Sequence, residues 1–365
     1  MIIANLIISS VYIGICFYLS RGLKNIGKKC YPKHPDKSVS VIVCARNEEE
    51  NIGKLLDCLS KQTYPQDSVQ IIIVDDRSTD KTAEIILSNK PKNLLFLQIK
   101  EEQNAIAPKK FAFEQAMKIA EGEIVVQTDA DSIVPDDWIE KLTAPFCDNE
   151  ISLVQGIVKY RFDNKISPIL KTYQNFDFLS HGIVAAAGIG KNIPLNANAN
   201  NFAFRRKTYE ILGGYGDLSK ATSGDDGLLM QKIWRNNNKI YFNTNSFVET
   251  KPEYSWKSLI NQRKKWGAQT QFYLPKQTVI LAFIFIFYCF TLLSPALLAV
   301  KILGELLFMR KGLLIFGEKK LLPHIIWISP INLFLTIYSV FSGIFTKFEW
   351  KGSKLSGKIK RKENL

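Results

Sequence analysis

The sequence reads VQIIIVDDRS over residues 69–78 and EIVVQTDAD over residues 123–131. In both stretches a run of β-formers ends directly in acidic residues. Parallel strands that are buried on both faces read as continuous apolar runs, and ligands bind outside the carboxyl ends of such strands. The two stretches therefore predict buried strands whose ends bring carboxylates to one binding edge of a sheet.

Strand and helix signals alternate on both sides of these stretches. Strands that alternate with helices of about ten residues predict parallel βαβ units, and hence an α/β fold. Beyond residue 131 the alternation becomes less regular. The expected strands are 39–44, 69–74, 94–99, 123–127 and 153–160, and the expected helices include 51–59, 109–120 and 135–146.

Three apolar runs, residues 2–20, 278–300 and 325–346, are long enough to cross a hydrocarbon core of ~30 Å. The first run has no basic region before it and no small-residue cleavage site, so we expect a retained anchor rather than a cleaved signal peptide. A buried N-terminal helix is the alternative interpretation. Residues 302–316 are also apolar, but they include Glu305 and two basic residues, and their position relative to a membrane stays open.

Positive charge gathers beside the apolar runs. The formal net charge is +14, and basic residues follow the first run and dominate residues 351–365. This pattern is typical of the cytoplasmic side of a membrane and of contact with anionic membrane lipids. Nucleic acid is not an expected partner, because no zinc-finger, RRM or KH pattern accompanies the charge. We expect a multi-pass protein of the inner cell membrane with a transmembrane anchor at 1–21, a cytoplasmic domain at 38–272, a transmembrane region at 278–346 and a basic cytoplasmic tail at 347–365.

Asp129 and Asp131 form a candidate metal site. Residues two apart in an extended segment point to the same side, and a carboxylate pair suits Mg²⁺ or Mn²⁺, which in turn can hold a diphosphate. An acidic turn before the next helix is the alternative. A second pair, Asp225 and Asp226, offers a base, although Asp225 could also cap a helix. Together the pairs predict a metal-dependent transferase that acts on a nucleotide-activated substrate.

Residues 262–266 read QRKKW. On a helix Gln262 and Trp266 share a face, because they are four residues apart. The Trp ring can stack on a sugar, and the Gln side chain can hydrogen-bond near a donor substrate. A basic amphipathic helix on a membrane surface is the alternative, and both interpretations can hold together.

With VIVCARNE at residues 41–48, the order of these motifs resembles that of the family 2 glycosyltransferases over roughly residues 38–270. The closer resemblance is to the membrane-bound branch, which includes cellulose, chitin, hyaluronan and poly-N-acetylglucosamine synthases, and to ceramide glucosyltransferase-like enzymes. It implies a GT-A fold with flanking transmembrane helices, a UDP-sugar donor and an inverting transfer that forms a β-glycosidic bond.

The resemblance also implies roles for single residues. Asp226 is the expected general base, Asp131 the expected ligand of Mg²⁺ or Mn²⁺, and Asp129 a contact to the metal or the ribose. Asp76, in preference to Asp75, is expected to bind the nucleoside, and Lys109 or Lys110 the nucleotide. The expected substrate-binding residues are Arg46, Glu48, Asp76, Lys109, Asp129, Asp225, Gln262, Arg263 and Trp266.

One position departs from the resemblance. Lys265 stands where the QxxRW motif has arginine, so the charge is kept but the planar fork for a bidentate phosphate contact is lost. Arg263 or Lys264 are candidates to compensate. Residues 201–205 and 213–215 resemble segments that shape the acceptor pocket, and Asp177 and His181 are candidates to line it.

The acceptor is left open between two hypotheses. One is a growing polysaccharide or a lipid-linked acceptor, and the other is the transfer of a single sugar to a membrane lipid. Three spans are few for a protein that extrudes its own polymer, which favours a lipid acceptor or a partner membrane subunit. A non-catalytic membrane protein that binds nucleotide sugars is the alternative from another class, and the intact acidic motifs argue against it.

Overall fold

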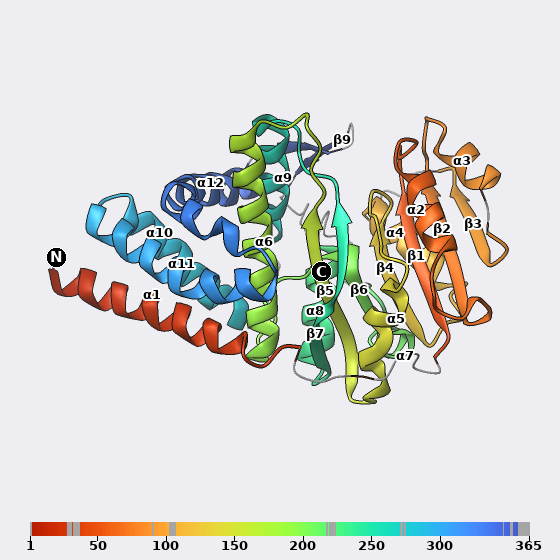
Figure 1. Ribbon diagram of the computed structural model, residues 1–365, viewed down its shortest axis with the longest axis horizontal. Coiled ribbons are helices and arrows are strands. Elements are labelled where there is room, and N and C mark those ends of the chain that lie inside the picture. The colour runs from red at the N-terminus through yellow and green to blue at the C-terminus, as the bar shows by residue number, and fades with distance from the viewer. Residues whose placement is uncertain are drawn as a thin grey trace, which may run out of the picture.

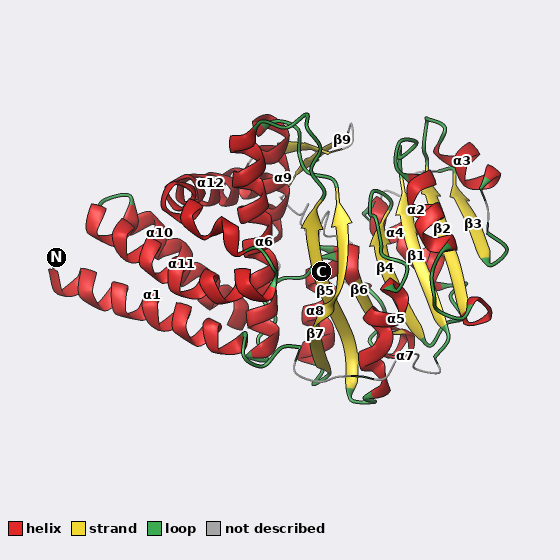
Figure 2. Cartoon of the chain, viewed as in Figure 1, coloured by secondary structure: helices red, strands yellow, loops and turns green. Residues whose placement is uncertain are grey.

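The computed structural model describes residues 2–27, 31, 37–89, 91–101, 107–216, 218, 224–270, 273, 275–345, 347–350 and 353–356. A seven-stranded sheet flanked by helices occupies one side of the molecule, and a group of long helices occupies the other (Figure 1). Figure 2 shows the same division by colour, with the seven-stranded sheet on one side and the N-terminal helix on the far side.

The sheet has the strand order β3-β2-β1-β4-β6-β5-β7. Strands β1 to β4 are parallel to one another, as the sequence predicts. Strand β6 is antiparallel to both β4 and β5, so the sheet is mixed. The sequence predicts parallel units only, and this antiparallel strand is not among them. The strands are β1 (Val39–Ala45), β2 (Val69–Asp76), β3 (Leu94–Ile99), β4 (Ile124–Asp129), β5 (Ile151–Tyr160), β6 (Phe202–Arg205) and β7 (Lys239–Thr250).

Alternating side chains of the central strands enter two hydrophobic cores. Val41 and Val43 of β1 pack on one face of the sheet, and Ile42 packs on the other. All three are fully buried, because helices cover both faces. The covering helices are α2 (Ile52–Ser60), α3 (Thr82–Ser88), α4 (Pro108–Met117), α5 (Trp138–Thr143), α6 (Pro168–Gly190), α7 (Arg206–Ile211), α8 (Asp225–Arg235) and α9 (Trp256–Gln269).

The group of long helices comprises α1 (Ile2–Gly22), α10 (Pro275–Thr291), α11 (Pro295–Ile315) and α12 (Ile325–Phe345). Helix α6 lies between this group and the sheet (Figure 1). Helices α1 and α6 meet at Gly22 and Gly190, where a Cβ atom on either glycine would collide with the other helix. One continuous core contains Leu19 of α1, Met309 of α11 and Ile42 of β1. The N-terminal helix is therefore packed into the same core as the sheet.

The apolar segments differ in part from the prediction. Among the described residues, one helical segment, Lys319–Phe345, is long and apolar enough to cross a membrane. The run at 278–300 is not a single helix, because α10 ends at Thr291 and Pro295 begins α11 at its first position, where proline is favoured. Residues 302–316, whose place was left open, belong mostly to α11. Of the expected basic tail, β8 (Lys347–Trp350) and β9 (Ser353–Ser356) form a hairpin, and the rest lies outside the described residues.

Candidate active site

The two acidic pairs predicted from the sequence lie in one cavity. Asp129, Asp131, Asp225 and Asp226 all line a cavity of about 810 Å³. Asp129 ends β4, and Asp131 lies in the turn that follows it, while Asp225 and Asp226 form the first turn of α8. Gly224, with a φ of 81°, precedes this turn in the left-handed region that glycine adopts without strain. The fold thus brings together carboxylates that are almost one hundred residues apart in the sequence.

Lys109 joins the two pairs. Its Nζ atom lies 2.9 Å from Asp129 Oδ1 and 2.8 Å from Asp225 Oδ2. Pro108 begins α4 at its first helical position, so the following lysine projects from the first turn toward the ends of the strands. Burial opposes the charge on Lys109, yet the two carboxylates raise its pKa well above the ordinary value. Lys109 therefore carries a permanent positive charge between the acidic pairs.

The two neighbouring aspartates have different surroundings. Asp226 Oδ2 accepts a hydrogen bond from Ala199 N at 2.9 Å, and Oδ1 accepts one from Gly227 N at 2.6 Å. Burial and the charge of Asp225 nevertheless raise the pKa of Asp226 to about 6. Burial alone would also raise the pKa of Asp225, but the Lys109 ammonium lowers it below the ordinary value. Asp226 is thus the carboxylate suited to take up a proton near neutral pH.

The donor set at the end of β4 fits a hard divalent cation. Carboxylate oxygens of Asp129 and Asp131 line the cavity, and oxygen ligands are those that Mg²⁺ and Mn²⁺ prefer. Among the described residues no group of three or more His, Cys, Asp or Glu side chains could hold a metal alone. A cation here would therefore take one or two protein carboxylates and complete its shell with substrate oxygens and water.

Three expected binding residues lie at the same sheet edge but outside the lining of the cavity. Asp76 ends β2 and pairs with Arg77, whose Nε atom lies 2.8 Å from Asp76 Oδ1. Glu48 follows β1 and accepts a hydrogen bond from Asn51 Nδ2 at 2.7 Å. Arg46 directly follows β1. Since β1 separates β2 from β4, Asp76 lies about two strand spacings, roughly 10 Å, from the carboxylates of β4.

Asp80, and neither Asp75 nor Asp76, contacts the start of helix α3. Asp80 Oδ1 accepts the hydrogen bond from Thr82 N at the start of α3, at 3.0 Å. Asp75 instead accepts a hydrogen bond from Gln98 Nε2 on the neighbouring strand at 3.2 Å. The two candidate lysines lie in different places. The ammonium of Lys110 is buried and donates to Leu218 O at 2.7 Å, whereas Lys109 lines the cavity.

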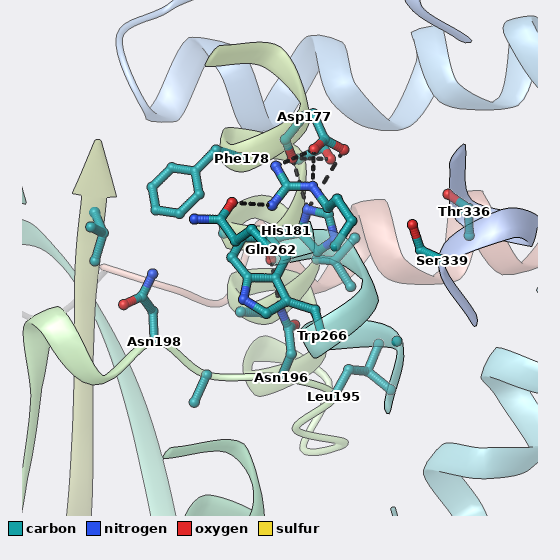
Figure 3. A pocket seen from close by; sticks show the side chains of 18 of the residues that line it. Asp177, Phe178, His181, Leu195, Asn196, Asn198, Gln262, Trp266, Thr336 and Ser339 are labelled. Carbon is teal, nitrogen blue, oxygen red and sulfur yellow. Dashed lines mark hydrogen bonds and ion pairs between the residues drawn. The ribbon is translucent and has the colours of Figure 1, made fainter. Parts of the chain in front are cut away.

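Helix α9 brings Gln262 and Trp266 to the cavity (Figure 3). Ser255 and Ser258 start this helix with reciprocal capping hydrogen bonds. The Trp266 ring stands edge-on to His181 of α6, with ring centroids 5.2 Å apart, and Phe178 lies alongside. Gln262 donates to Glu253 Oε1 at 3.1 Å. The predicted shared face of the two residues therefore exists, and its aromatic surface suits a sugar ring.

Arg263 is engaged within the protein. Its Nε atom donates to Asp177 Oδ2 at 2.6 Å, and its Nη2 atom also pairs with that carboxylate. The guanidinium lies 4.0 Å from the centroid of the Trp266 ring. The Arg263 side chain is almost fully buried, and it lines the cavity together with Trp266 and Asp177.

Lys265, the position that departs from the expected motif, lines the cavity with Lys109 and the acidic pairs. Burial, and then the nearby charge of Lys109, lower the pKa of Lys265 to about 8. A lysine so close to Asp225 and Asp129 places a second cation beside the candidate metal site. The substitution of Lys for Arg therefore keeps a positive charge facing the cavity.

The two segments that are expected to shape an acceptor pocket make contacts within the fold. The side chain of Asn201 donates to Ile157 O at 2.9 Å and accepts from Trp138 Nε1 at 3.0 Å, which ties β6 to its neighbours. Tyr215, at the end of the 213–215 segment, is fully buried against Phe113 and Tyr209. Asp177 and His181, by contrast, line the cavity as predicted.

Part of the cavity lining comes from helices that carry no predicted site residue. The cavity extends from the carboxylates into the group of long helices, where residues of α1, α10, α11 and α12 line it. Among them Asn332, Thr336 and Ser339 of α12 recur at helical spacing within an apolar run. The spacing of these polar residues is visible in the sequence. Only the packing of α12 shows that they face the cavity that also contains the carboxylates.

Comparisons with known proteins found similarity to glycosyltransferases. Residues 40–209 match the family described as Glycosyl transferase family 2. Probable glycosyltransferase YdaM of Bacillus subtilis is 28% identical over 241 residues, which are 65% of this chain and 56% of that protein. Beta-monoglucosyldiacylglycerol synthase of Synechocystis sp. is 26% identical over 238 residues, 64% of this chain and 48% of that protein. The aligned part thus spans only about half the length of these relatives.

One solved structure shares the fold over most of the chain. It is the mannosyltransferase PcManGT from Pyrobaculum calidifontis in complex with GDP-Man and Mn²⁺. The TM-score is 0.59 at 20% sequence identity, and the alignment covers 90% of this chain and 97% of that chain. At this level of identity the likeness concerns the fold alone.

Proposed function

We propose that this chain, which has a GT-A-like fold, is a family 2 glycosyltransferase that transfers a sugar from a UDP-sugar to a hydroxyl group of a membrane-associated acceptor. The observation that carries the proposal is the position of Asp226. This carboxylate lines a cavity shared with the candidate metal site, the Lys109 ammonium and the aromatic face of α9.

Asp226 acts as the general base. Its raised pKa lets it take the proton from the acceptor hydroxyl as that oxygen attacks the anomeric carbon. The bond between that carbon and the diphosphate breaks on the opposite face, so an α-linked donor gives a β-linked product. The two backbone N–H groups at Ala199 and Gly227 hold the carboxylate in place for this step.

The donor lies along the edge formed by β2, β1 and β4. Asp76 binds the nucleoside, and Lys109 and Lys265 hold the diphosphate near Asp129 and Asp131. The backbone supports this assignment, because Asn47 and Arg77, which lie just beyond the ends of β1 and β2, have φ values of 52° and 58°. Such strained positions cluster at ligand sites. Mg²⁺ or Mn²⁺ held by Asp131 and Asp129 would offset the charge that builds up on the departing diphosphate.

The long helices attach the enzyme to a membrane. Most of the exposed large apolar side chains lie on α1, α10, α11 and α12, including Ile3, Phe17 and Phe334. An exposed apolar surface of this extent marks an interaction site. Membrane lipids are the proposed occupants, with α12 crossing the bilayer, α1 in contact with its lipids and the sheet on the cytoplasmic side. A partner membrane subunit would be needed only if the product were a polymer that crosses the membrane.

The test is incorporation of radiolabelled sugar by membranes that contain the protein, with Mg²⁺ or Mn²⁺ and a panel of UDP-sugars. GDP-mannose belongs in the panel, because PcManGT was solved with it. Loss of the base is expected to lower kcat by roughly 10²–10⁴-fold in the Asp226→Asn variant, with donor binding little changed. Equal labelling by wild type and variant would overturn the assignment and favour a non-catalytic nucleotide-sugar-binding protein.

A further inference from the structure

The part of the cavity that lies among the long helices has two unlike walls. One wall is apolar and comes from α10, α11 and α1, with Leu281, Phe285, Met309 and Ile15 among its residues. The other wall comes from α12, where the polar residues Asn332, Thr336 and Ser339 line the cavity beside Leu335, Val340 and Ile344. At about 810 Å³ the whole cavity lies in the upper part of the 300–1,000 Å³ range of small-ligand sites, so it has room beyond a donor sugar.

The polar wall is a continuous stripe on an apolar helix. Ser329, Asn332, Thr336 and Ser339 are three or four residues apart, so they lie on one face of α12. The opposite face exposes Phe334 and other large apolar residues. In Figure 3, Thr336 and Ser339 lie across the cavity from Asp177, His181 and Trp266. A helix that exposes apolar residues outward and hydroxyl groups inward is built to bind a polar group in an apolar environment.

Several oxygens along this cavity have unused hydrogen-bonding capacity. Within the described part of the chain, Gln155 Oε1, Asn196 Oδ1, Glu305 Oε2 and Ser339 Oγ are buried and have no hydrogen-bond partner. A buried oxygen without a partner is costly, so a cavity lined by such atoms fits a ligand that supplies donors. Amide and carboxylate oxygens only accept hydrogen bonds. The matching ligand therefore carries hydrogen-bond donors, which hydroxyl groups can supply.

Glu305 adds a second polar group deep among the helices. Its Oε1 atom pairs with Lys301 Nζ at 2.5 Å, and Lys301 Nζ also donates to Ser329 Oγ at 2.8 Å. The ion pair thus joins α11 to the polar stripe of α12. Charged groups among apolar helices are rare and usually functional.

We propose that this amphipathic part of the cavity is the acceptor site, and that the acceptor is a membrane lipid with a hydroxylated headgroup. Its acyl chains contact the apolar wall, and its headgroup hydroxyls donate to Ser339 and the neighbouring unpaired oxygens, which directs one hydroxyl to Asp226. A glycan chain fits less well, because its hydroxyls would face Leu281 and Phe285 without partners. The inference rests on the proposed sugar transfer and specifies its substrate.

The test uses the full chain in phosphatidylcholine vesicles and a diacylglycerol that carries a photoreactive diazirine in one acyl chain. Peptides of the apolar wall, around Phe285 and Met309, are expected to be labelled. Unlabelled dioleoylglycerol should compete, whereas extra dioleoylphosphatidylcholine, which has no free hydroxyl, should not. Labelling confined to exposed faces, such as that of Phe334, would overturn the inference.

Matched variants test the polar wall. Replacing Thr336→Val together with Ser339→Ala removes two hydroxyls at nearly constant volume and is expected to weaken competition by dioleoylglycerol about tenfold. Phe334→Leu changes the outward face of the same helix and should leave competition by dioleoylglycerol unchanged. Equal competition in both variants would contradict the role of the stripe, and thermal unfolding in detergent checks that each variant is folded.

Sugar transfer in the same vesicles separates the two proposals. Asp226-dependent transfer to soluble cellotetraose, without labelling inside the cavity, would refute the lipid site and leave the proposed function standing. Labelling inside the cavity without any Asp226-dependent sugar turnover would refute the proposed function and leave the lipid site standing.

Discussion

Asp225 and Asp226 are neighbours in the sequence and differ in what surrounds them. The Lys109 ammonium lies 2.8 Å from Asp225 and keeps that carboxylate ionised, whereas Asp226 is held by backbone N–H groups and carries a raised pKa. Two carboxylates whose environments separate their pKa values can take separate roles. Asp225 therefore pairs with the lysine, and Asp226 is the carboxylate that we propose exchanges a proton.

The pH dependence of turnover follows from this difference. Burial and the charge of Asp225 raise the pKa of Asp226 to about 6, so the base becomes protonated as the pH falls through that value. We expect kcat/KM to fall about tenfold per pH unit below this pKa and to level off above it. Steady-state rates between pH 4.5 and 7.5 at saturating metal measure this, and a flat profile would contradict the assignment of Asp226 as base.

Lys265 is expected to stabilise the departing diphosphate. Loss of a hydrogen bond to a charged group costs about 1.5–3 kcal/mol, so Lys265→Met should lower kcat/KM roughly 10- to 100-fold. Lys265→Arg keeps the charge and should stay close to wild type at pH 7. Burial lowers the pKa of Lys265 to about 8, so wild type should lose this positive charge, and with it kcat/KM, as the pH rises above 8. The Arg variant stays charged and should keep its kcat/KM there. An unaffected Met variant would show that Lys265 does not contact the donor.

At the scale of elements, the packing of α9 on α12 joins the proposed catalytic and acceptor sites. The two helices touch through glycines, because a Cβ atom on Gly267 would collide with Ser339 O and one on Gly343 would collide with Lys264 O. This close approach places Trp266 and the polar stripe of α12 on the same cavity. A change in the distance between the helices would therefore alter both substrate sites.

Gly343→Ala tests that contact. The added methyl has no space between α12 and α9, and overpacking of this kind costs about 1–3 kcal/mol. We expect a lower Tm in detergent and a reduced rate of transfer. Gly14→Ala in α1 is the matched control, since nothing lies within 4 Å of its Cβ position and alanine favours a helix. Equal Tm values for the two variants would show that α12 can move away from α9 without cost.

At the scale of the whole molecule, the long helices and the sheet share one core, yet their outer surfaces differ. Leu19 of α1 is buried with the sheet residue Ile42 in that core, while Phe17 on the same helix is 60% exposed. One face of α1 therefore packs in the protein core, and its other face is apolar and exposed. Such a helix suits the proposed contact with membrane lipids beside the catalytic domain.

Protection from a water-soluble reagent tests this arrangement. In proteoliposomes, a cysteine at Phe17 should react with a membrane-impermeant maleimide only after detergent is added. A cysteine at Ile211, which is 72% exposed on α7, should react at once. Mass spectrometry of the two peptides reports the difference, and immediate labelling of Phe17→Cys would refute the membrane position of α1.

Sequence patterns predicted the elements that local chemistry decides. The apolar run before Asp75 and the run before Asp129 became β2 and β4, because a strand buried on both faces must be apolar throughout. The four-residue strand β6 was not predicted, since so short a segment shows no periodicity and its antiparallel direction depends on its neighbours. The run at 278–300 was read as one span, because hydropathy does not register the helix start at Pro295.

The sequence by itself determined which residue types meet at the edge of the sheet, because strands that end in carboxylates converge there whatever the rest of the chain does. Only the tertiary structure decided that Lys109, and not Lys110, joins Asp129 to Asp225, since adjacent residues on a helix point in different directions. It also decided that the polar face of α12 turns inward and meets the same cavity as Asp226. Helix packing sets that orientation, and no local pattern records it.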